Sequence, residues 1–423
     1  MPGLLESADV SGFTPVRESV RDREQHEEVV VLSRSELATM EAWPHAFGHL
    51  RKDSRYYEIV EDTICPEFKY RYFGIKTKAG DISSIQPFFV LNQDLLAGTG
   101  TRVKAIAGAI RRFWPGFLTL KTLMMGCAGG EGHLHAEDPG ERRRQAEILA
   151  ENISTLARQE KASLIVLKEF PARYRNSLSC FLSHGFSMIP SMPMTRLDIS
   201  QYSSFEDYLS KAIKAKRRTE FRRKFKEAEQ SIPIELEVTC DAERAIDEIY
   251  VLYEQVFKRS NLQFEKLTEA YFREIGRRMP DKVRFFLWRQ NGKLIAFSFC
   301  MVEGETLYGE CLGLDYTVAL KLHLYFYVMR DTISWAIANG FKSIVSTSLG
   351  YGPKLQMRHV LEPLDLYIRH TSPLMNAVLR RVLPLLEPTR SDETLKSFPN
   401  YSDLRPKDCH PGRAKPEPGS QKR

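Results

Sequence analysis

The chain has 423 residues and a net charge of +7, and its 43% hydrophobic content is enough to fill two cores at roughly 150 residues per domain. No stretch approaches the ~18 consecutive apolar residues of a transmembrane helix, and residues 1–27 lack the apolar region of a signal peptide. The chain has seven cysteines and no CxxC pair, which indicates that the cysteines are small buried apolar residues of a protein in a reducing compartment. The composition therefore argues against an integral membrane protein and favours a cytoplasmic one.

The first half of the chain alternates apolar strand patterns with one long helical pattern. A helix is predicted at Arg142–Gln159, where apolar residues recur every three to four positions. The strands predicted around it are Tyr70–Thr77, Ile82–Leu91, Phe117–Gly126, Ser163–Glu169 and Met192–Ile199.

The second half repeats this order. Val283–Arg289 and Leu294–Val302 are predicted to form a hairpin, because Asn291-Gly292 lies between them. A strand at Thr306–Leu312 and a helix at Leu320–Asn339, ended by Gly340, are predicted to follow. The last strands predicted are Ser343–Ser348 and Leu364–Arg369. The recurrence predicts two α/β domains, each an α+β mixed sheet, in tandem.

The expected domain boundaries follow from composition. Residues 1–27 mix Pro, Gly, Ser and opposed charges, so we expect a disordered N-terminus. A first domain is expected at 28–200 and a second at 201–387, which opens with a basic helix capped by Ser204. The segment 388–423 is rich in Pro, Lys and Arg and is expected to be a disordered basic tail.

The basic helix carries the strongest charge signal. Between Lys211 and Lys226 there are nine Lys or Arg residues and one acid, Glu220. Four of the cations recur every four residues and are expected on one face, namely Lys214, Arg218, Arg222 and Lys226. Such a row is either a solvated face or a site for an anion such as a phosphate or RNA.

This helix, read as LSKAIKAKRRTEFRRKFKEAE from Leu209, resembles the basic helix that opens the second domain of FemAB-like proteins. These are tandem-domain relatives of the GCN5-related N-acetyltransferases (GNAT). Further similar segments are Asn291–Ala296, Gly313–Asp315, Gly350–Leu355 and Leu364–His370. The resemblance covers roughly 38–386, in the first half by element order alone, and it implies two GNAT-like domains.

The resemblance implies where an acyl donor would bind. In the GNAT fold two strands splay apart, here Thr306–Leu312 and Ser343–Ser348, and the opened backbone binds the donor, with Cys311, Leu312 and Gly313 as the expected contacts. An acyl-CoA donor needs a glycine-rich loop for its pyrophosphate, whereas the segment from Gly313 has one glycine and an acid. This departure keeps an aminoacyl-tRNA donor open, with tRNA bound by the basic helix.

Acyl transfer to an amine needs a group to take the amine proton. Glu310, on the strand that splays, is the favoured base, and the alternative is an edge residue facing solvent. Strand alternation predicts that Tyr308, Glu310 and Leu312 share one face and that Cys311 lies on the other. Cys311 is more typical of buried packing than of a nucleophile.

Tyr351 and Lys354 follow the next strand in a Gly-Tyr-Gly-Pro turn. They are expected to protonate the leaving group or to hold a phosphate, and the alternative is that they are ordinary turn residues. Tyr308, Asp315 and His323 are the expected substrate contacts, although His323 lies among apolar helix residues and also fits a packing role.

The first half holds a glycine-rich segment from Gly126 to His135. Its glycines suit a phosphate, but Glu131 and the following acids would repel one, so a flexible surface loop is the favoured interpretation. Cys127, His133 and His135 suggest zinc, but no second ligand pair completes a site, and no metal is expected.

Two functional hypotheses remain. The first is an N-acyltransferase that moves an acyl group from acyl-CoA, or an aminoacyl group from tRNA, to an amine of a small-molecule or lipid-linked cell-envelope precursor. The second is a non-catalytic protein that binds an anionic ligand.

Overall fold

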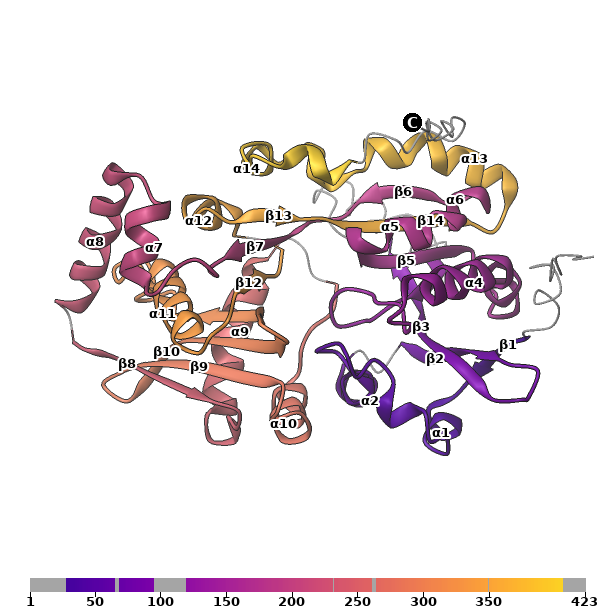
Figure 1. Ribbon diagram of the computed structural model, residues 1–423, viewed down its shortest axis with the longest axis horizontal. Coiled ribbons are helices and arrows are strands. Elements are labelled where there is room, and N and C mark those ends of the chain that lie inside the picture. The colour runs from indigo at the N-terminus through magenta and orange to yellow at the C-terminus, as the bar shows by residue number, and fades with distance from the viewer. Residues whose placement is uncertain are drawn as a thin grey trace, which may run out of the picture.

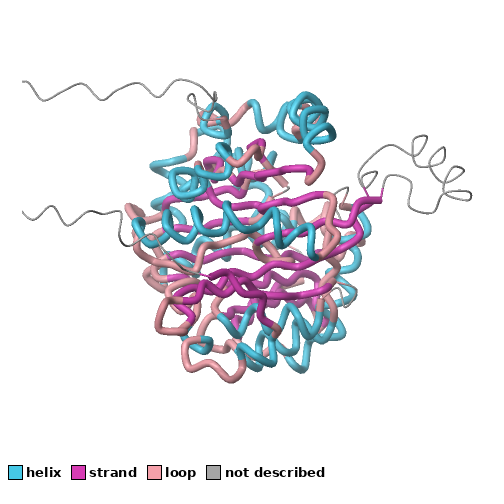
Figure 2. The backbone as a smooth tube through the Cα atoms, turned by 90° about the vertical axis from the view of Figure 1, so that its right-hand side faces the viewer, coloured by secondary structure: helices cyan, strands magenta, loops and turns pink. Residues whose placement is uncertain are grey.

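The computed structural model describes residues 28–64, 68–94, 119–230, 232–260, 264–348 and 350–405. Two seven-stranded mixed sheets form the framework, with helices around the strands (Figures 1 and 2). The mixed α/β class predicted from the sequence is confirmed. Within the described residues, no helix is both long and apolar enough to cross a membrane.

The first sheet has one parallel pair, β4 with β5, and its other neighbours are antiparallel. Its strands in spatial order are β1 (Glu28–Leu32), β2 (Lys69–Lys76), β3 (Ile82–Asp94), β4 (Thr119–Met125), β5 (Leu164–Pro171), β14 (Leu364–His370) and β6 (Ser187–Pro190). The predicted strand at Phe117–Gly126 begins in residues outside the described ranges.

The second sheet also has one parallel pair, β11 with β12. Its strands in spatial order are β13 (Val360–Glu362), β7 (Met194–Asp198), β12 (Ser343–Ser346), β11 (Thr306–Leu314), β10 (Lys293–Glu303), β9 (Val283–Gln290) and β8 (Ile234–Thr239). The predicted hairpin of β9 and β10 is confirmed by their antiparallel register.

The two halves exchange strands, so the sheets do not divide at the expected boundary of 200/201. β7, from the first half of the chain, pairs with β12, and β14, from the second half, lies between β5 and β6. The two crossing segments run antiparallel beside each other, and Ser191 N donates to Leu364 O at 2.8 Å. Figure 1 shows β13 running on into β14 across the molecule. The strand pattern could not reveal this, because alternation identifies a strand but not its sheet.

Helices cover the outer face of each sheet. α4 (Pro139–Gln159) packs its apolar side on the first sheet, and α7 (Phe205–Ala212), α8 (Ala215–Glu229) and α11 (Leu324–Ala338) pack on the second. The shorter helices are α1 (Arg34–Leu37), α5 (Arg175–Leu178), α6 (Cys180–Ser183), α12 (Tyr351–Gln356) and α14 (Glu393–Lys396), and α13 (Pro373–Val382) lies at the outer edge of the first sheet.

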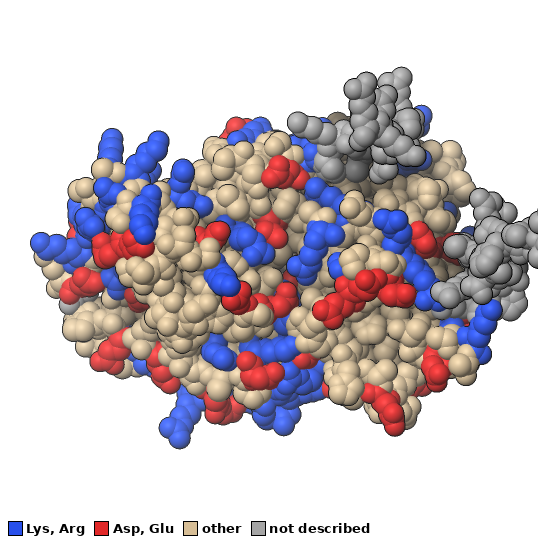
Figure 3. All heavy atoms as spheres, viewed as in Figure 1, with Lys and Arg blue, Asp and Glu red and all other residues tan. Residues whose placement is uncertain are grey.

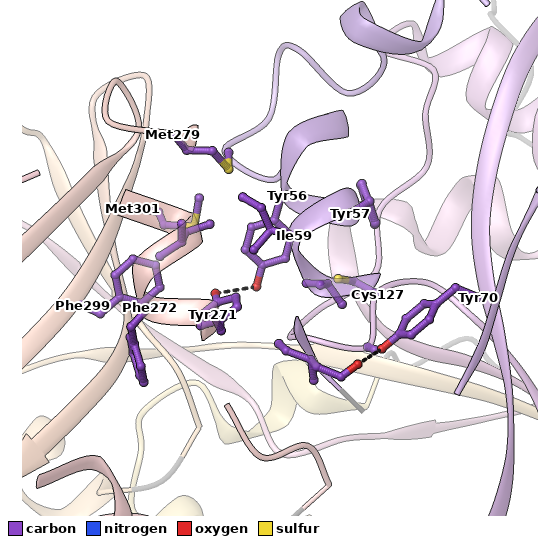
Figure 4. Close-up of a cluster of buried hydrophobic side chains, with 14 of the residues drawn as sticks. Tyr56, Tyr57, Ile59, Tyr70, Cys127, Tyr271, Phe272, Met279, Phe299 and Met301 are labelled. Atoms are coloured by element: carbon purple, nitrogen blue, oxygen red, sulfur yellow. Dashed lines mark hydrogen bonds between the residues drawn. The ribbon is translucent and has the colours of Figure 1, made fainter. Parts of the chain in front are cut away.

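A shared core joins the two halves. α2 (Ser54–Thr63) from the first half meets α9 (Ile246–Arg259) and α10 (Glu269–Arg278) from the second in one apolar cluster. Tyr271 OH donates to Tyr56 OH at 3.2 Å across this contact (Figure 4). Both tyrosines are almost fully buried, so the halves share a packed interior rather than a solvated contact.

The expected disorder of the tail is wrong for residues 388–405. This segment forms α14 between short 3-10 turns at Pro388–Arg390 and Tyr401–Leu404. Leu395, Phe398 and Leu404 are buried against Tyr351 and Leu361. These three buried apolar side chains order a segment whose average composition is polar. Residues 406–423 lie outside the described ranges.

Candidate active site

The splay predicted between the two central strands is present. β11 and β12 pair in parallel only from Thr306 opposite Ser343 to Gly309 opposite Ser346. Thr347 N still donates to Gly309 O at 3.2 Å, but β12 has ended while β11 continues to Leu314. The parallel pairing therefore opens at Glu310, and the strand segment 310–314 extends past its neighbour.

Glu310 occupies a β-bulge. Gly309 lies opposite Cys300 and Cys311 lies opposite Phe299, so Glu310 is the extra residue of the pair. The bulge breaks the simple alternation, and the predicted grouping is wrong in part. Leu312 packs on the α7, α8 and α11 side, whereas Cys311 packs with the shared core on the side of α2.

Glu310 is ion-paired with a loop of the first half. Arg51 Nε donates to Glu310 Oε1 at 2.6 Å, and Lys52 Nζ lies 3.5 Å from Oε2. Both cations also pair with Glu131, with Lys52 Nζ 2.6 Å from its Oε2. Arg51, Lys52, Glu131 and Glu310, here called the interface ion cluster, thus join the two halves at the splay.

The interface ion cluster is deeply buried, with Arg51 2% and Lys52 0% exposed. Burial alone would raise the pKa of the Glu131 carboxyl, but Arg51 and Lys52 outweigh it and hold that pKa well below its usual range. Burial likewise opposes the charge on Arg51, yet Glu131 and Glu310 keep its pKa above the ordinary value. A cluster of this kind tolerates removal of a partner poorly, because the charge left behind has no water around it.

The glycine-rich segment is part of this cluster, so the predicted flexible surface loop is wrong. Glu131 and His133 are buried, and His133 Nε2 lies 3.1 Å from Glu131 Oε1. Burial lowers the pKa of His133 to about 4, even though Glu131 opposes this. Gly130 has φ +102°, and a Cβ there would lie 2.2 Å from Lys52 Nζ. Gly130 is thus explained by the close approach of a buried lysine rather than by mobility.

Lys354 lies at the opened end of β12. Its Nζ donates to Thr347 O at 2.6 Å, and the N–H of the same Thr347 binds Gly309 beside Glu310. The side chain is 4% exposed, and burial lowers its pKa to about 7. Lys354 is thus linked through Thr347 to Gly309, the residue before the bulged Glu310. A pKa of about 7 also suits a group that accepts and donates protons near neutral pH.

His359 is a second buried base next to Lys354. It is 3% exposed, and its Nδ1 and Nε2 lack a hydrogen-bond partner among the described residues. Burial, followed by the nearby Lys354 charge, lowers its pKa to about 3. The imidazole is therefore neutral near neutral pH.

The other expected site residues have different surroundings. Tyr308 stacks under Arg51, 3.7 Å from Cζ to the ring centre, and so joins the interface ion cluster. Tyr351 OH donates to Pro193 O at 2.8 Å, and its ring packs against Phe398. Asp315 binds Lys293 at 2.7 Å and the N–H of Thr317 at 2.9 Å.

His323 and Cys311 also have structural partners. His323 precedes α11 in a left-handed conformation, and its Nε2 lies 2.9 Å from Glu227 on α8. Burial raises the pKa of the Cys311 thiol, which disfavours a thiolate nucleophile. The structure therefore brings Tyr308 and Glu310 together, places Lys354 across the splay, and leaves Asp315 and His323 near the start of α11.

The backbone before α11 is closed on itself. The N–H groups of Val318 and Ala319 bind Asp315 O, that of Leu322 binds Val318 O, and that of Leu324 binds Ala319 O. In the first half, Asp138 accepts from the N–H groups of Gly140 and Glu141 at the start of α4. Carboxylates and internal bonds thus use several of the N–H groups that could bind a pyrophosphate at either helix.

The basic segment forms two helices rather than one. Ser204 Oγ accepts from Asp207 N at 3.1 Å, as predicted, but the chain leaves the helical conformation at Ile213 and Lys214. Arg218 donates to Ser210 O at 2.6 Å, and Arg222 binds Glu206 at 2.7 Å. The predicted row therefore consists of two arginines that bind groups of α7, of which Arg222 is itself exposed, and the exposed lysines Lys214 and Lys226. It lies within the dense gathering of cations over α7 and α8 (Figure 3).

Signals for Arg51, Lys52 and Glu131 were weak in the sequence. Arg51-Lys52 is an ordinary charged pair in a loop, and Glu131 lies in a segment whose glycines indicated mobility. Within the described ranges, no group of three or more His, Cys, Asp or Glu residues is arranged to hold a metal ion.

A half-open hollow of about 400 Å³ lies at the start of α4, in the first half of the chain. His49, His135, Glu137 and Glu141 are among the residues that line it, and none of the site residues expected from the sequence does. It is not assigned to the reaction.

Residues 120–355 match the FemAB-like family, described by its role in peptidoglycan biosynthesis and recognition. The match covers more than half of the chain, so the chain belongs to the FemAB-like family. It is accordingly an acyltransferase. A comparison with curated proteins gives no significant match.

Several solved structures are similar at low identity. FemX is 10% identical, with 80% of this chain and 96% of that chain covered and a TM-score of 0.47. A tandem GNAT protein from the clavulanic acid biosynthesis pathway is 11% identical over 82% and 99%, with a TM-score of 0.47. The C-terminal domain of a putative lysylphosphatidylglycerol synthetase from Agrobacterium fabrum is 11% identical over 75% and 88%, with a TM-score of 0.45.

Proposed function

We propose that this protein transfers an aminoacyl group from tRNA to an amine of a peptidoglycan-type cell-envelope precursor, at the splay between β11 and β12. The observation that carries the proposal is the opening of the β11–β12 pairing at Glu310, with the buried Lys354 hydrogen-bonded to Thr347 at the same point. Family membership supports the acceptor class.

The donor is inferred from what surrounds the splay. Several N–H groups before α11 and at the start of α4 already have partners within the chain, which disfavours a pyrophosphate site there. Exposed Lys214, Lys216 and Lys226 on and beside α8 offer a surface for a polyanion. Acyl-CoA is the second candidate, because the extended segment 310–314 of β11 could bind an extended donor along its backbone.

Lys354 acts as the proton carrier in this proposal. As the neutral amine it takes a proton from the attacking amine of the acceptor when the new C–N bond forms at the ester carbonyl. The resulting ammonium returns that proton to the ribose oxygen as the ester C–O bond breaks. A group whose pKa is near the working pH performs both transfers efficiently.

Glu310 is assigned a positioning role rather than that of the base. Its two oxygens already face Arg51 and Lys52, so accepting a proton would disrupt a buried ion pair. The pairing instead fixes the bulge, and with it the backbone of the opened strand. The expected leaving-group role of Tyr351 is not retained, because its hydroxyl binds Pro193 O.

The test is product formation by the purified full-length chain. Aminoacyl-tRNA or acyl-CoA would be mixed with nucleotide-linked and lipid-linked muropeptide precursors, and mass spectrometry would detect the new amide. We expect product with aminoacyl-tRNA and a loss of about 10²–10⁴-fold in Lys354→Met. Lys321→Met, at an exposed lysine, is the matched control. Product formed only with acyl-CoA would overturn the assignment of aminoacyl-tRNA as the donor. The absence of product with either donor would overturn the whole proposal.

The tRNA surface has its own test. Replacing Lys216 and Lys226 by Ala should weaken tRNA binding and lower the salt slope by roughly 0.7–0.9 per lost contact. The control exchanges Lys78 and Lys321, which are also exposed. If both variants and the wild type bind tRNA with equal affinity at low salt, the cations of α8 form a solvated face and not a tRNA site.

A further inference from the structure

One helix of the described chain exposes a long apolar face. None of the residues of α13 is buried, and Leu374 is 71% exposed. The apolar row continues past the helix to Leu385, which is 80% exposed. We define the α13 outer face by its six exposed apolar residues, which are Leu374, Met375, Val378, Val382, Leu385 and Leu386.

The opposite side of the same helix anchors it to the first sheet. Asn376 accepts from His370 N and donates to Gly185 O, each at 2.9 Å. Leu379 and Leu383 pack on the shared core. Leu374, Val378 and Val382 are spaced at i, i+4 and i+8 and so form a separate stripe. One apolar side of the helix therefore packs against the rest of the protein, and a second apolar side is exposed.

Charge accompanies the exposed stripe. Arg380 and Arg381 are exposed in the last turn of α13, and the sequence Pro373–Leu386 contains no acid. A helix with exposed leucines and arginines but no carboxylates is typical of a segment that lies in a bilayer interface. Anionic headgroups attract such cations.

We propose that the α13 outer face docks onto the surface of a bilayer that contains anionic lipids. A second copy of the chain fits this face less well, because a twofold contact would bring Arg380 and Arg381 of both copies together without acids to pair them. Figure 1 shows α13 along the outer edge of the molecule. The proposal is independent of the donor and of the reaction.

The experiment is flotation of the full-length protein with vesicles of phosphatidylcholine, with and without half phosphatidylglycerol. We expect binding to the anionic vesicles, and at least a tenfold loss in the variant Leu374→Ser/Leu385→Ser. The matched control is Val251→Ser/Leu320→Ser, which changes two other exposed apolar residues. Circular dichroism should show the same fold in all, since the four side chains are exposed.

Charge and self-association give separate readouts. Arg380→Gln/Arg381→Gln should weaken binding to anionic vesicles severalfold, and added salt should reduce the difference. Binding that is unchanged in the Leu374→Ser/Leu385→Ser variant, or that is as strong on pure phosphatidylcholine, would overturn the proposal. A dimer seen by light scattering that this variant abolishes would also overturn it, because the occupant would then be a second copy.

Discussion

Arg51 and Glu310 form an ion pair, 2.6 Å from Nε to Oε1, that joins the loop before α2 to the bulge of β11. The two residues are 259 positions apart and belong to different halves of the chain. The contact therefore ties the geometry of the opened strand to the packing between the halves. It also explains a carboxylate on a central strand, since the arginine and Lys52 compensate for its burial.

The first prediction concerns Glu310→Gln. We expect it to lower the free energy of unfolding by about 1–3 kcal/mol, because Arg51 keeps Glu131 but loses a charged acceptor. Urea unfolding of the variant and of Glu305→Gln, an exposed acid on the same hairpin, would measure this. If Glu310 positions the strand, the pH–rate profile should keep its shape while the rate falls. If the rise of the rate with pH disappears in Glu310→Gln but remains in Lys354→Met, Glu310 rather than Lys354 is the base.

The second prediction concerns Lys354 and pH. Burial lowers its pKa to about 7 in the fold, while in the unfolded chain it stays near 10.5. Between these values the unfolded state binds more protons, so this residue makes stability rise as the pH rises. Below pH 7 both states are protonated, and the full cost of the buried ammonium is present.

Lys354→Met should consequently be more stable than the wild type below pH 7. The gain in the free energy of unfolding should be on the order of several kcal/mol, reduced by the loss of the hydrogen bond to Thr347. The difference should shrink steadily from pH 7 to about pH 10. Thermal unfolding of both proteins over this range would measure it. A difference that does not change with pH would mean that the amine has water or a counter-charge in solution.

The order of strands and helices was predictable because the apolar residues of both halves recur with the periods typical of strands and helices. Val283–Arg289 and Leu294–Val302 flank an Asn-Gly turn, and they pair as expected. The exchange of β7 and β14 was not predictable, because both are short strands of mixed apolar and polar residues that would suit either sheet. Sheet membership depends on contacts between distant segments, which a local pattern does not contain.

The site was predictable only where it lies on the second-half repeat. Glu310 could be selected from its place on a predicted strand and Lys354 from its place after one, whereas Arg51 and Lys52 carry no periodic signal. The strand alternation used for Leu312 failed because one bulged residue shifts every later side chain to the other face. The position of such a bulge depends on the partner strand.

The third prediction concerns His359. Its two ring nitrogens lack partners among the described residues, so the fold bears the cost of desolvating them. His359→Leu should stabilise the protein by about 1 kcal/mol at pH 7. Because the buried imidazole has a pKa of about 3 and the unfolded one about 6.5, the wild type loses stability as the pH falls through this window. The advantage of His359→Leu over the wild type should therefore grow from pH 6.5 towards pH 4, as measured by thermal unfolding.

The last prediction separates backbone strain from a steric clash at Gly130. Gly130 and Gly292 both have positive φ, +102° and +75°. A Cβ at Gly292 meets nothing within 4 Å, so Gly292→Ala should cost only the strain of a left-handed alanine, about 1–2 kcal/mol. At Gly130 the Cβ would lie 2.2 Å from Lys52 Nζ, which is fully buried and bound to Glu131. Lys52 cannot move aside without leaving that carboxylate, so Gly130→Ala should cost about 3–5 kcal/mol. Denaturant unfolding of the two variants would give the difference, and equal losses would show that Lys52 is free to move and that the interface ion cluster does not fix the glycine.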